Sequence, residues 1–302
     1  MNEIPETHCG FIAILGAPNV GKSTLLNRVV GAKVSIVSSK VQTTRTRILG
    51  IALVENSQLI FVDTPGIFNP KRRLDRAMIA AAWGGARDAD RIILLVDSKR
   101  GVDINTEIII DKLKENGFDN LDLVLNKIDL INKQDLLKLT KSLNNYGIFK
   151  EIFMVSAEKG DGVSDLISYL RSKIPVSPWL FPQDQISDMP MRLLAAEITR
   201  EKLFMKLHQE LPYAITVETE NWQKRDDQSI RIEQTIYVER DSQRSIVLGK
   251  NGQMIKSIGM ESRKELSEVV DAKVHLFLFV KVREKWGDDP SHYTNWGLDF
   301  NV

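Results

Sequence analysis

Hydrophobic positions divide the first part of the chain into short apolar runs separated by segments with helical spacing. The runs predict strands at residues 11–15, 48–53, 59–62, 91–96, 121–125 and 151–155. Nearly all are continuously apolar, which is typical of strands that are covered on both faces. Their alternation with helical patterns predicts an α/β domain, a mostly parallel sheet wrapped by helices.

A proline-rich stretch interrupts this pattern. Residues 174–182 contain three prolines, and Met189-Pro190 follows, so we expect a linker there. We place the first domain at residues 8–175 and the linker at 176–190.

The periodicity changes after the linker. A helical pattern over residues 191–204 precedes strand-like runs at 214–217 and 231–238. Residues 244–248, a glycine-containing turn, a helix over about 253–268 and a strand at 273–280 follow. This order predicts a small α+β domain at residues 191–286 and a tail at 287–302.

Composition indicates the cellular compartment of the protein more clearly than its function. Of 302 residues 27% are charged and 43% hydrophobic, with a net charge of +1, so the charge of the whole chain neither favours nor excludes nucleic acid. The single cysteine, Cys9, excludes an internal disulfide and a cysteine metal cluster and favours the reducing cytoplasm. No apolar run is long enough to span a bilayer, and no heptad or repeat suggests an obligate assembly, so we expect a cytoplasmic monomer.

A phosphate-binding loop follows the first predicted strand directly. It matches the full pattern G-x-x-x-x-G-K-[ST] and consists of Gly16, Ala17, Pro18, Asn19, Val20, Gly21, Lys22 and Ser23. Backbone N–H groups of such a loop and the following helix N-terminus favour phosphate. We expect Lys22 to reach the β and γ phosphates and Ser23 to bind Mg²⁺.

The third predicted strand leads into a second nucleotide motif. Its residues are Asp63, Thr64, Pro65 and Gly66. Asp63 can hold the ligand shell of Mg²⁺, and the Gly66 N–H can meet the γ phosphate. Within residues 42–46, Gln-Thr-Thr-Arg-Thr, a threonine hydroxyl can also reach Mg²⁺, and we favour Thr44 over Thr43. We expect Lys22, Thr44 and Gly66 to be the catalytic residues.

A third motif selects the base. Asn126, Lys127 and Asp129 follow the fifth predicted strand, and the Asp129 carboxylate could accept from guanine N1–H and its amine. Adenine would leave that acceptor unpaired. Backbone N–H groups at Ser156, Ala157 and Glu158 could bind guanine O6, and Ser156 could equally cap a helix. The ordered motifs predict a GTP and GDP site.

Ile67 predicts slow hydrolysis. In Ras-type enzymes a glutamine at its position orients the attacking water, and an apolar side chain cannot do so. We therefore expect a monovalent cation or a partner to raise the rate. Asn19 is a candidate K⁺ ligand through its side-chain oxygen, or else it only shapes the loop.

The second domain carries a G-x-x-G loop. The loop, Gly249-Lys250-Asn251-Gly252, lies between two helical segments, and Lys256 follows it closely. K-homology domains use such a loop to clamp single-stranded RNA. The surrounding order of elements fits the type II topology. Trp222, Trp286 and Trp296 could stack on bases or pack in the core.

The combination of motifs closely resembles the Era-type GTPases of bacteria over almost the whole chain. The resemblance rests on the phosphate-loop phrase, residues 42–46, the apolar residue 67 and the tail beginning Trp286-Gly287-Asp288-Asp289. It implies a Ras-like GTPase domain followed by a type II K-homology (KH) domain. It further implies binding of the 3′ end of 16S rRNA, assistance in maturation of the 30S subunit, and peripheral association with the cytoplasmic face of the inner membrane.

Two other classes of function stay open at this point. The chain could be a constitutive RNA-binding module whose GTPase domain only supports folding or docking. It could also be a membrane or cell-cycle signalling GTPase in which the G-x-x-G turn has no RNA-binding role. Dependence of RNA affinity on the bound nucleotide discriminates among the three.

Overall fold

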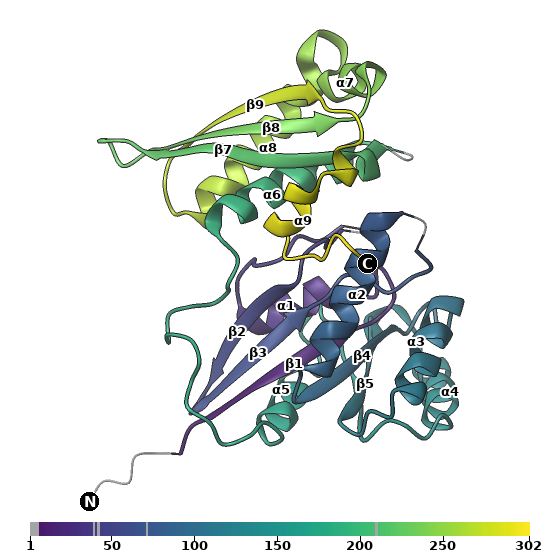
Figure 1. Ribbon diagram of the computed structural model, residues 1–302. Coiled ribbons are helices and arrows are strands. Elements are labelled where there is room, and N and C mark those ends of the chain that lie inside the picture. Colours follow the sequence, from purple (N-terminus) through teal and green to yellow (C-terminus); the bar gives the residue numbers. More distant parts are fainter. Residues whose placement is uncertain (1–5, 39, 41–42, 71, 209–210) are drawn as a thin grey trace, which may run out of the picture. The chain divides into compact units, whose positions relative to one another are not determined.

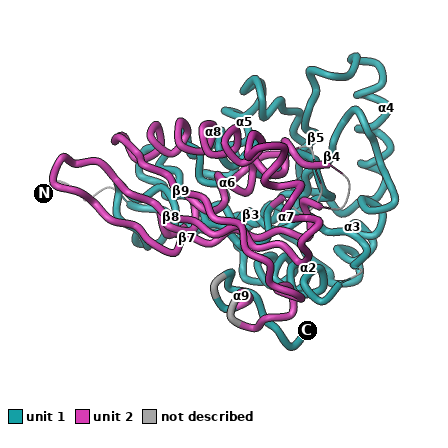
Figure 2. Tube along the Cα trace, turned by 90° about the horizontal axis from the view of Figure 1, so that it is seen from above, with its two compact units in different colours: residues 1–35, 44–188, 294–302 teal, residues 36–43, 189–293 magenta. Residues whose placement is uncertain are grey.

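The computed structural model describes residues 6–38, 40, 43–70, 72–208 and 211–302. They form two compact units (Figure 2). Unit 1 comprises residues 1–35, 44–188 and 294–302, and unit 2 comprises residues 36–43 and 189–293. Both units are built from discontinuous segments, whereas sequence periodicity only suggests consecutive domains.

Unit 1 contains a six-stranded sheet (Figure 1). In chain order its strands are β1 (His8–Leu15), β2 (Ile48–Val54), β3 (Ser57–Asp63), β4 (Arg91–Asp97), β5 (Leu121–Asn126) and β6 (Ile152–Met154). Their spatial order is β2-β3-β1-β4-β5-β6, in which β2 pairs antiparallel with β3 and every other neighbouring pair is parallel. The predicted mostly parallel sheet is confirmed.

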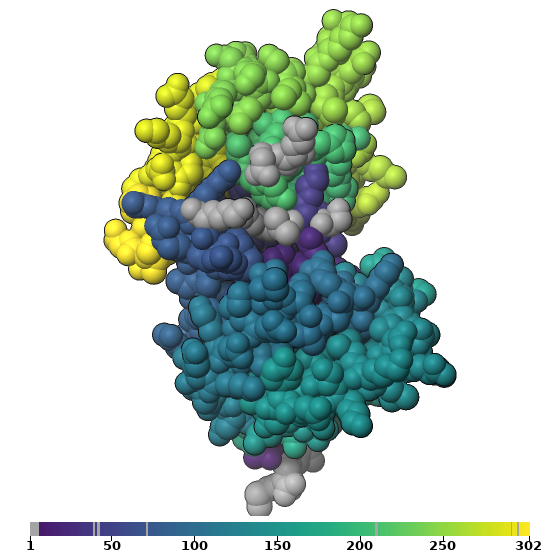
Figure 3. Space-filling view, turned by 90° about the vertical axis from the view of Figure 1, so that its right-hand side faces the viewer, coloured from purple at the N-terminus to yellow at the C-terminus, as the bar shows by residue number. Residues whose placement is uncertain are grey.

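Helices lie on both faces of this sheet, which is why its central strands are buried throughout (Figure 1). They are α1 (Lys22–Val30), α2 (Arg73–Arg87), α3 (Ile104–Glu115), α4 (Lys133–Asn144) and α5 (Val163–Arg171). Helix α3 starts after Asp103, whose side chain accepts from the Thr106 N–H at 2.8 Å as an N-cap. The outer surface of α3 and α4 faces the viewer in Figure 3.

The carboxyl ends of the parallel strands bring five loops to one edge of the sheet. The residues that follow β1, β3, β4, β5 and β6 are, in order, 16–21, 64–66, 98–101, 127–129 and 155–158. Open α/β sheets bind ligands at this edge. The fold therefore gathers motifs that are far apart in sequence.

The proline-rich segment belongs to unit 1 up to residue 188 and packs against the sheet of that unit. Gln58 Oε1 accepts from the backbone N–H groups of Leu180 and Phe181 at 2.9 and 3.0 Å. The Ile51 N–H donates to the Ile186 carbonyl at 2.9 Å. The Ile51 contact covers part of the outer edge of β2, which is otherwise an unpaired strand edge.

Unit 2 is a three-stranded sheet with helices. Its elements are α6 (Met191–Lys206), β7 (Ile215–Lys224), β8 (Ile230–Val238), α7 (Asp241–Leu248), α8 (Gln253–Val269) and β9 (Val274–Val282). Strand β8 is central, antiparallel to β7 and parallel to β9. The order helix, strand, strand, helix, helix, strand is the predicted one, and β7 extends further than its apolar start suggests.

Tryptophan packs inside unit 2. Trp286, at the start of a 3₁₀ turn (Trp286–Asp288), is 2% exposed and its Nε1 donates to the Ala214 carbonyl at 2.9 Å. Trp222 packs against a cluster that includes Leu194 and Ile232. Both side chains therefore serve the core, the alternative to base stacking.

Residues 36–43 belong to unit 2, and described residues of this segment pack on α6. The Val37 N–H donates to Glu201 Oε1 at 2.8 Å, and the Arg200 guanidinium donates to the Thr43 carbonyl. Arg200 is 1% exposed and pairs with Glu197 on the same helix. Gln42, which the sequence motif includes, lies outside the described residues.

The last residues of the chain contact α2 within unit 1. The Arg73 guanidinium lies 4.4 Å from the centre of the Phe300 ring, and Arg76 Nε donates to the Val302 carbonyl at 3.4 Å. A short helix, α9 (Pro290–Asn295), precedes this stretch. The segment predicted as a tail therefore divides between the two units.

Candidate functional site

The phosphate loop, residues 16–23, connects β1 to the first turn of α1. Helix α1 begins at Lys22, directly after Gly21. Gly21 has no side chain that could cap the helix, so the N–H groups of the first turn are available to an anion. The loop therefore has the form that the sequence predicts for phosphate binding.

Lys22 is the buried cation of this loop. It is 7% exposed, and its Nζ donates to the carbonyl oxygens of Gly16 and Ala17, both at 3.1 Å. Burial lowers the pKa of Lys22 to about 8, although the Asp63 carboxylate opposes this shift. A phosphate could replace these carbonyls as acceptor and would stabilise the ammonium form.

Hydroxyl groups surround the carboxylate of Asp63 at the end of β3. Asp63 Oδ2 accepts hydrogen bonds from Ser23 Oγ at 2.7 Å and from Ser35 Oγ at 3.0 Å. The Thr44 Oγ1 lies 3.0 Å from Ser23 Oγ. Burial raises the pKa of Asp63, while the Lys22 charge and the hydroxyls act in the opposite direction.

This cluster suits a magnesium ion. Asp63 Oδ1 is buried and has no hydrogen-bond partner within the described ranges. Mg²⁺ is usually held by oxygen atoms, often from one or two carboxylates together with substrate phosphates. Elsewhere in the described part of the chain, no three His, Cys, Asp or Glu side chains gather as an alternative metal centre.

Thr44, rather than Thr43, reaches the cluster. Thr44 is buried beside Ser23. The Thr43 Oγ1 instead donates to the Lys40 carbonyl at 2.7 Å, within unit 2. The two neighbouring threonines thus have different surroundings.

Residues 64–67 lie against the phosphate loop. The buried Thr64 hydroxyl donates to the Ile14 carbonyl at 2.7 Å, and the Ile67 N–H donates to the Gly16 carbonyl at 3.2 Å. A Cβ atom on Gly66 would lie 3.0 Å from the Cα of Pro18. Pro65 is also buried. Ile67 is 2% exposed, so this side chain packs inside and offers no polar atom to water.

Asn126 connects three parts of the site. Its Nδ2 donates to the Val20 carbonyl at 2.8 Å, and its Oδ1 accepts from the Ala157 N–H at 2.9 Å. Lys127, with a left-handed φ of 63°, places its Nζ 2.7 Å from the Asn19 carbonyl. The amide and the ammonium group therefore brace the phosphate loop from the side of the base motif.

Asp129 is oriented by Ser156. The Ser156 Oγ donates to Asp129 Oδ1 at 2.8 Å, and Lys159 Nζ lies 3.5 Å from Oδ2. The Ser156 hydrogen bond, ahead of the Lys159 charge, keeps the pKa of Asp129 below its usual value. The carboxylate is therefore ionised at neutral pH, as an acceptor for guanine N–H groups requires.

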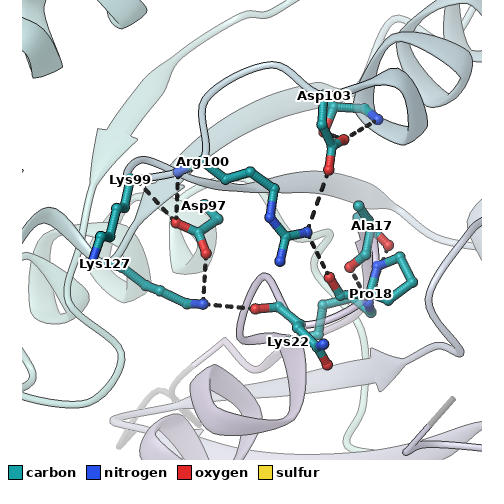
Figure 4. A network of polar contacts seen from close by, with 11 residues as sticks. Ala17, Pro18, Lys22, Asp97, Lys99, Arg100, Asp103 and Lys127 are labelled. Carbon is teal, nitrogen blue, oxygen red and sulfur yellow. Dashed lines mark hydrogen bonds and ion pairs between the residues drawn. The ribbon is translucent and has the colours of Figure 1, made fainter. Parts of the chain in front are cut away.

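Sequence reasoning missed several residues at this edge. Arg28 on α1 donates to the carbonyls of Ala157 and Glu158. Ser35 donates to Asp63, and a further network starts at Asp97, the last residue of β4 (Figure 4). The position of Asp97 at a strand end, equivalent to that of Asp63, was a signal that could have identified it.

The G-x-x-G loop connects α7 to α8 in unit 2. Gly249 has a φ of 71°, and a Cβ atom there would lie 2.6 Å from that of Met254. Gly252 has a φ of 73°, and a Cβ atom added to it would have no neighbouring atom within 4 Å. Lys250 and Asn251 between them are exposed, as is Lys256 on α8. The loop can therefore receive a phosphate backbone closely at Gly252.

Comparisons with known proteins agree across the chain. Residues 11–127 match a family model described as 50S ribosome-binding GTPase, and residues 210–287 match one described as KH domain. GTPase Era of Agrobacterium fabrum (strain C58 / ATCC 33970) is 60% identical over 299 residues, 99% of this chain and 94% of the relative. GTPase Era of Sinorhizobium medicae (strain WSM419) is 59% identical over 97% of this chain and 94% of the relative.

Solved structures show the same likeness. A crystal structure of Era in complex with MgGDPNP and nucleotides 1506–1542 of 16S ribosomal RNA aligns with a TM-score of 0.92 at 37% identity, over 98% of this chain and 100% of that one. A variant of Aquifex aeolicus Era bound to GDP.AlF4- aligns with a TM-score of 0.91 at 36% identity, over 98% and 100%.

Proposed function

This chain belongs to the Era family of GTPases, and from that premise we propose that it binds the single-stranded 3′ end of 16S rRNA under the control of GTP and assists 30S subunit biogenesis. The observation that carries the proposal is the likeness, over 98% of the chain, to Era in complex with MgGDPNP and a 16S rRNA fragment. A GTPase domain followed by a KH domain accounts for both activities.

In the nucleotide site, we assign the phosphates to residues 16–23 and the γ phosphate to Lys22 and Gly66. Buried Lys22 supplies positive charge where charge develops during phosphoryl transfer. Ser23, Thr44 and Asp63 would hold Mg²⁺, which, when bound, neutralises charge on the phosphate oxygens. Thr64, Pro65 and Ile67 shape the side of the nucleotide site that lies against the phosphate loop.

We assign the guanine base to the neighbouring loops. Asp129 accepts from the N–H groups of guanine, and Asn126 and Lys127 hold the surrounding backbone. Ser156 orients the Asp129 carboxylate. Ala157 and Glu158 lie beside it, and their N–H groups are the donors we assign to guanine O6.

Intrinsic hydrolysis is slow in this proposal, because the buried Ile67 cannot orient water. Asn19, with a left-handed φ of 65° in the phosphate loop, is our candidate K⁺ ligand. Hydrolysis measured in potassium and in sodium at equal ionic strength tests this role. Equal rates in the two salts would remove it.

RNA binding is assigned to unit 2. Gly249, Lys250, Asn251 and Gly252 clamp the phosphate backbone, and Lys256 adds charge nearby. We keep residues 8–175 as the GTPase domain, 176–190 as the linker, 191–286 as the KH domain and 287–302 as the tail.

The proposal places a monomer in the cytoplasm, where its RNA partner is, with peripheral association at the inner membrane surface. Among the described residues, no helix combines the length and apolar character that crossing a membrane requires. Sedimentation with vesicles that contain anionic lipid tests the peripheral association, and its absence would leave the RNA role intact.

The decisive experiment is equilibrium binding of a fluorescent RNA from the 3′ end of 16S rRNA. Affinity is measured with a GTP analogue, with GDP and without nucleotide, at one fixed salt concentration because phosphate contacts are salt-dependent. Gly252→Asp adds a negative charge at the open side of the loop, and Gly252→Ala is its uncharged control.

We expect the tightest binding with the GTP analogue, a strong loss in Gly252→Asp and a smaller one in Gly252→Ala. Equal binding in all three nucleotide states would instead support a constitutive RNA-binding module. No binding in any state would support a signalling GTPase without an RNA role.

A further inference from the structure

Five successive carbonyl groups of the phosphate loop each accept a hydrogen bond from a side chain. The donor and acceptor pairs are Lys22 to Gly16 and Ala17 at 3.1 Å each, Arg100 to Pro18 at 3.2 Å, Lys127 to Asn19 at 2.7 Å and Asn126 to Val20 at 2.8 Å. Four of these five bonds come from residues of the nucleotide motifs. Arg100, in the turn after β4, belongs to none of them (Figure 4).

The Arg100 contact determines the direction of one backbone N–H. The Pro18 carbonyl and the Asn19 N–H belong to the same peptide group, and the described chain contains no cis peptide bond. In a trans peptide these two groups point in opposite directions. A guanidinium that holds the carbonyl therefore directs the Asn19 N–H away from Arg100. Because Pro18 has no N–H of its own, the Asn19 N–H is the next donor after that of Ala17.

Asp97 contacts both Arg100 and Lys127, the two residues that donate to the Pro18 and Asn19 carbonyls. It is 6% exposed, and its Oδ1 accepts from the N–H groups of Lys99 and Arg100 at 3.0 and 3.2 Å. Its Oδ2 accepts from Lys127 Nζ at 2.6 Å. Asp103, the N-cap of α3, lies 3.3 Å from Arg100 Nη1 and orients the guanidinium further. One carboxylate thus couples the Arg100 turn to the base motif (Figure 4).

We propose that Arg100 is a positioning residue for nucleotide binding, which orients the Pro18–Asn19 peptide from outside the phosphate loop, and that Asp97 holds Arg100 and Lys127 in place for it. The proposal rests on the proposed function, since it takes residues 16–23 as the phosphate site. Arg100 acts through the loop backbone and not through contact with the nucleotide. Its removal consequently weakens GDP and GTP alike.

The test compares Arg100→Met with Lys99→Met in the full chain. Lys99 is the adjacent exposed cation, and in Figure 4 only its backbone N–H takes part in the network. Equilibrium affinity is measured for fluorescent GDP and for a GTP analogue at fixed Mg²⁺. We expect both affinities to fall about five-fold in Arg100→Met, as for one lost hydrogen bond, and neither to change in Lys99→Met. Arg100→Lys should recover part of the loss.

The melting temperature of each nucleotide-free variant separates positioning from folding. We expect Arg100→Met to have the same melting temperature as the wild type, because a half-exposed side chain contributes little to stability. A lower melting temperature with unchanged affinity would overturn the proposal in favour of a structural role. A loss confined to the GTP analogue would overturn it in favour of direct contact with the γ phosphate.

Asp97→Asn provides a second variant. The amide keeps the shape of the side chain but loses the charge that attracts Lys127, so we expect weaker binding of both nucleotides. Unchanged affinity in both Asp97→Asn and Arg100→Met would overturn the proposal. Failure of the wild type to bind either nucleotide would instead overturn the proposed function, and with it this role.

Discussion

The hydroxyl oxygens of Ser23 and Thr44 lie 3.0 Å apart, although 21 positions separate them in the sequence. Ser23 Oγ also donates to Asp63 at 2.7 Å. Two hydroxyls and a carboxylate therefore meet at the carboxyl end of β3. We propose that Thr44 senses a metal-bound nucleotide, because its hydroxyl could leave the Ser23 hydroxyl and bind the metal ion instead.

Thr44→Ala should slow GTP hydrolysis about ten- to hundred-fold, since the variant loses one oxygen ligand near the transferred phosphate. Thr43→Ala is the matched control, because the Thr43 hydroxyl bonds the Lys40 carbonyl outside the cluster. Single-turnover hydrolysis at saturating Mg²⁺ measures both. Equal rates for the two variants would contradict the assignment of Thr44.

Nucleotide affinity should fall as the pH rises above about 8. Burial lowers the pKa of Lys22 from 10.5 to about 8, so below that pH the free protein already carries the ammonium that phosphate binds. Above it, binding requires uptake of a proton, and affinity falls by up to about ten-fold per pH unit. Titrations with GDP at about pH 7, 8 and 9 measure this.

Lys22→Met controls for other titrating groups, including those of the nucleotide. This variant has no ammonium to protonate, so its weaker affinity should change less over the same interval. A wild-type profile parallel to that of Lys22→Met would show that Lys22 does not titrate there.

Asp129→Asn should reverse the preference for guanine. The amide replaces one acceptor by a donor, which fits a base with a carbonyl at C2, such as xanthine, better than one with an amine. We expect GDP to bind at least about ten-fold more weakly and xanthosine diphosphate more tightly than in the wild type. Competition between the two nucleotides measures the ratio, and an unchanged ratio would place the base elsewhere.

Gly249→Ala should destabilise unit 2 by about 1–3 kcal/mol, through backbone strain and overpacking. The reason is its φ of 71° together with a Cβ position only 2.6 Å from that of Met254. Gly252→Ala, at a similar φ but in open space, should cost less. Urea unfolding of both variants provides the comparison. Equal losses would mean that the Met254 contact has no effect.

Local pattern was sufficient for much of the fold. The apolar runs locate all six strands of unit 1 because nearly all of these strands are buried along most of their length. The order of elements in unit 2 also follows from periodicity, since amphipathic helices and half-buried strands repeat with different periods. The ends of the strands depend on pairing with neighbouring strands, as the length of β7 depends on β8. The local sequence pattern could not predict them.

The candidate site was predictable only where a motif is contiguous. Residues 16–23, 63–66 and 126–129 carry their signal in adjacent residue types. Arg100 and Arg28 carry no such signal, because each donates to a carbonyl group that lies in a loop distant in sequence. An arginine in a polar turn has no local feature that identifies its acceptor.

The sequence by itself determined the class of the protein: an α/β GTPase domain, a KH domain and the chemistry of their loops, all of which depend on residue type and spacing. Tertiary structure alone decided how closely Thr44 approaches Ser23, that burial lowers the pKa of Lys22, and that Val37 and Thr43 pack on α6. Burial and partner distance depend on the folding of remote segments against one another, and no local pattern contains that information.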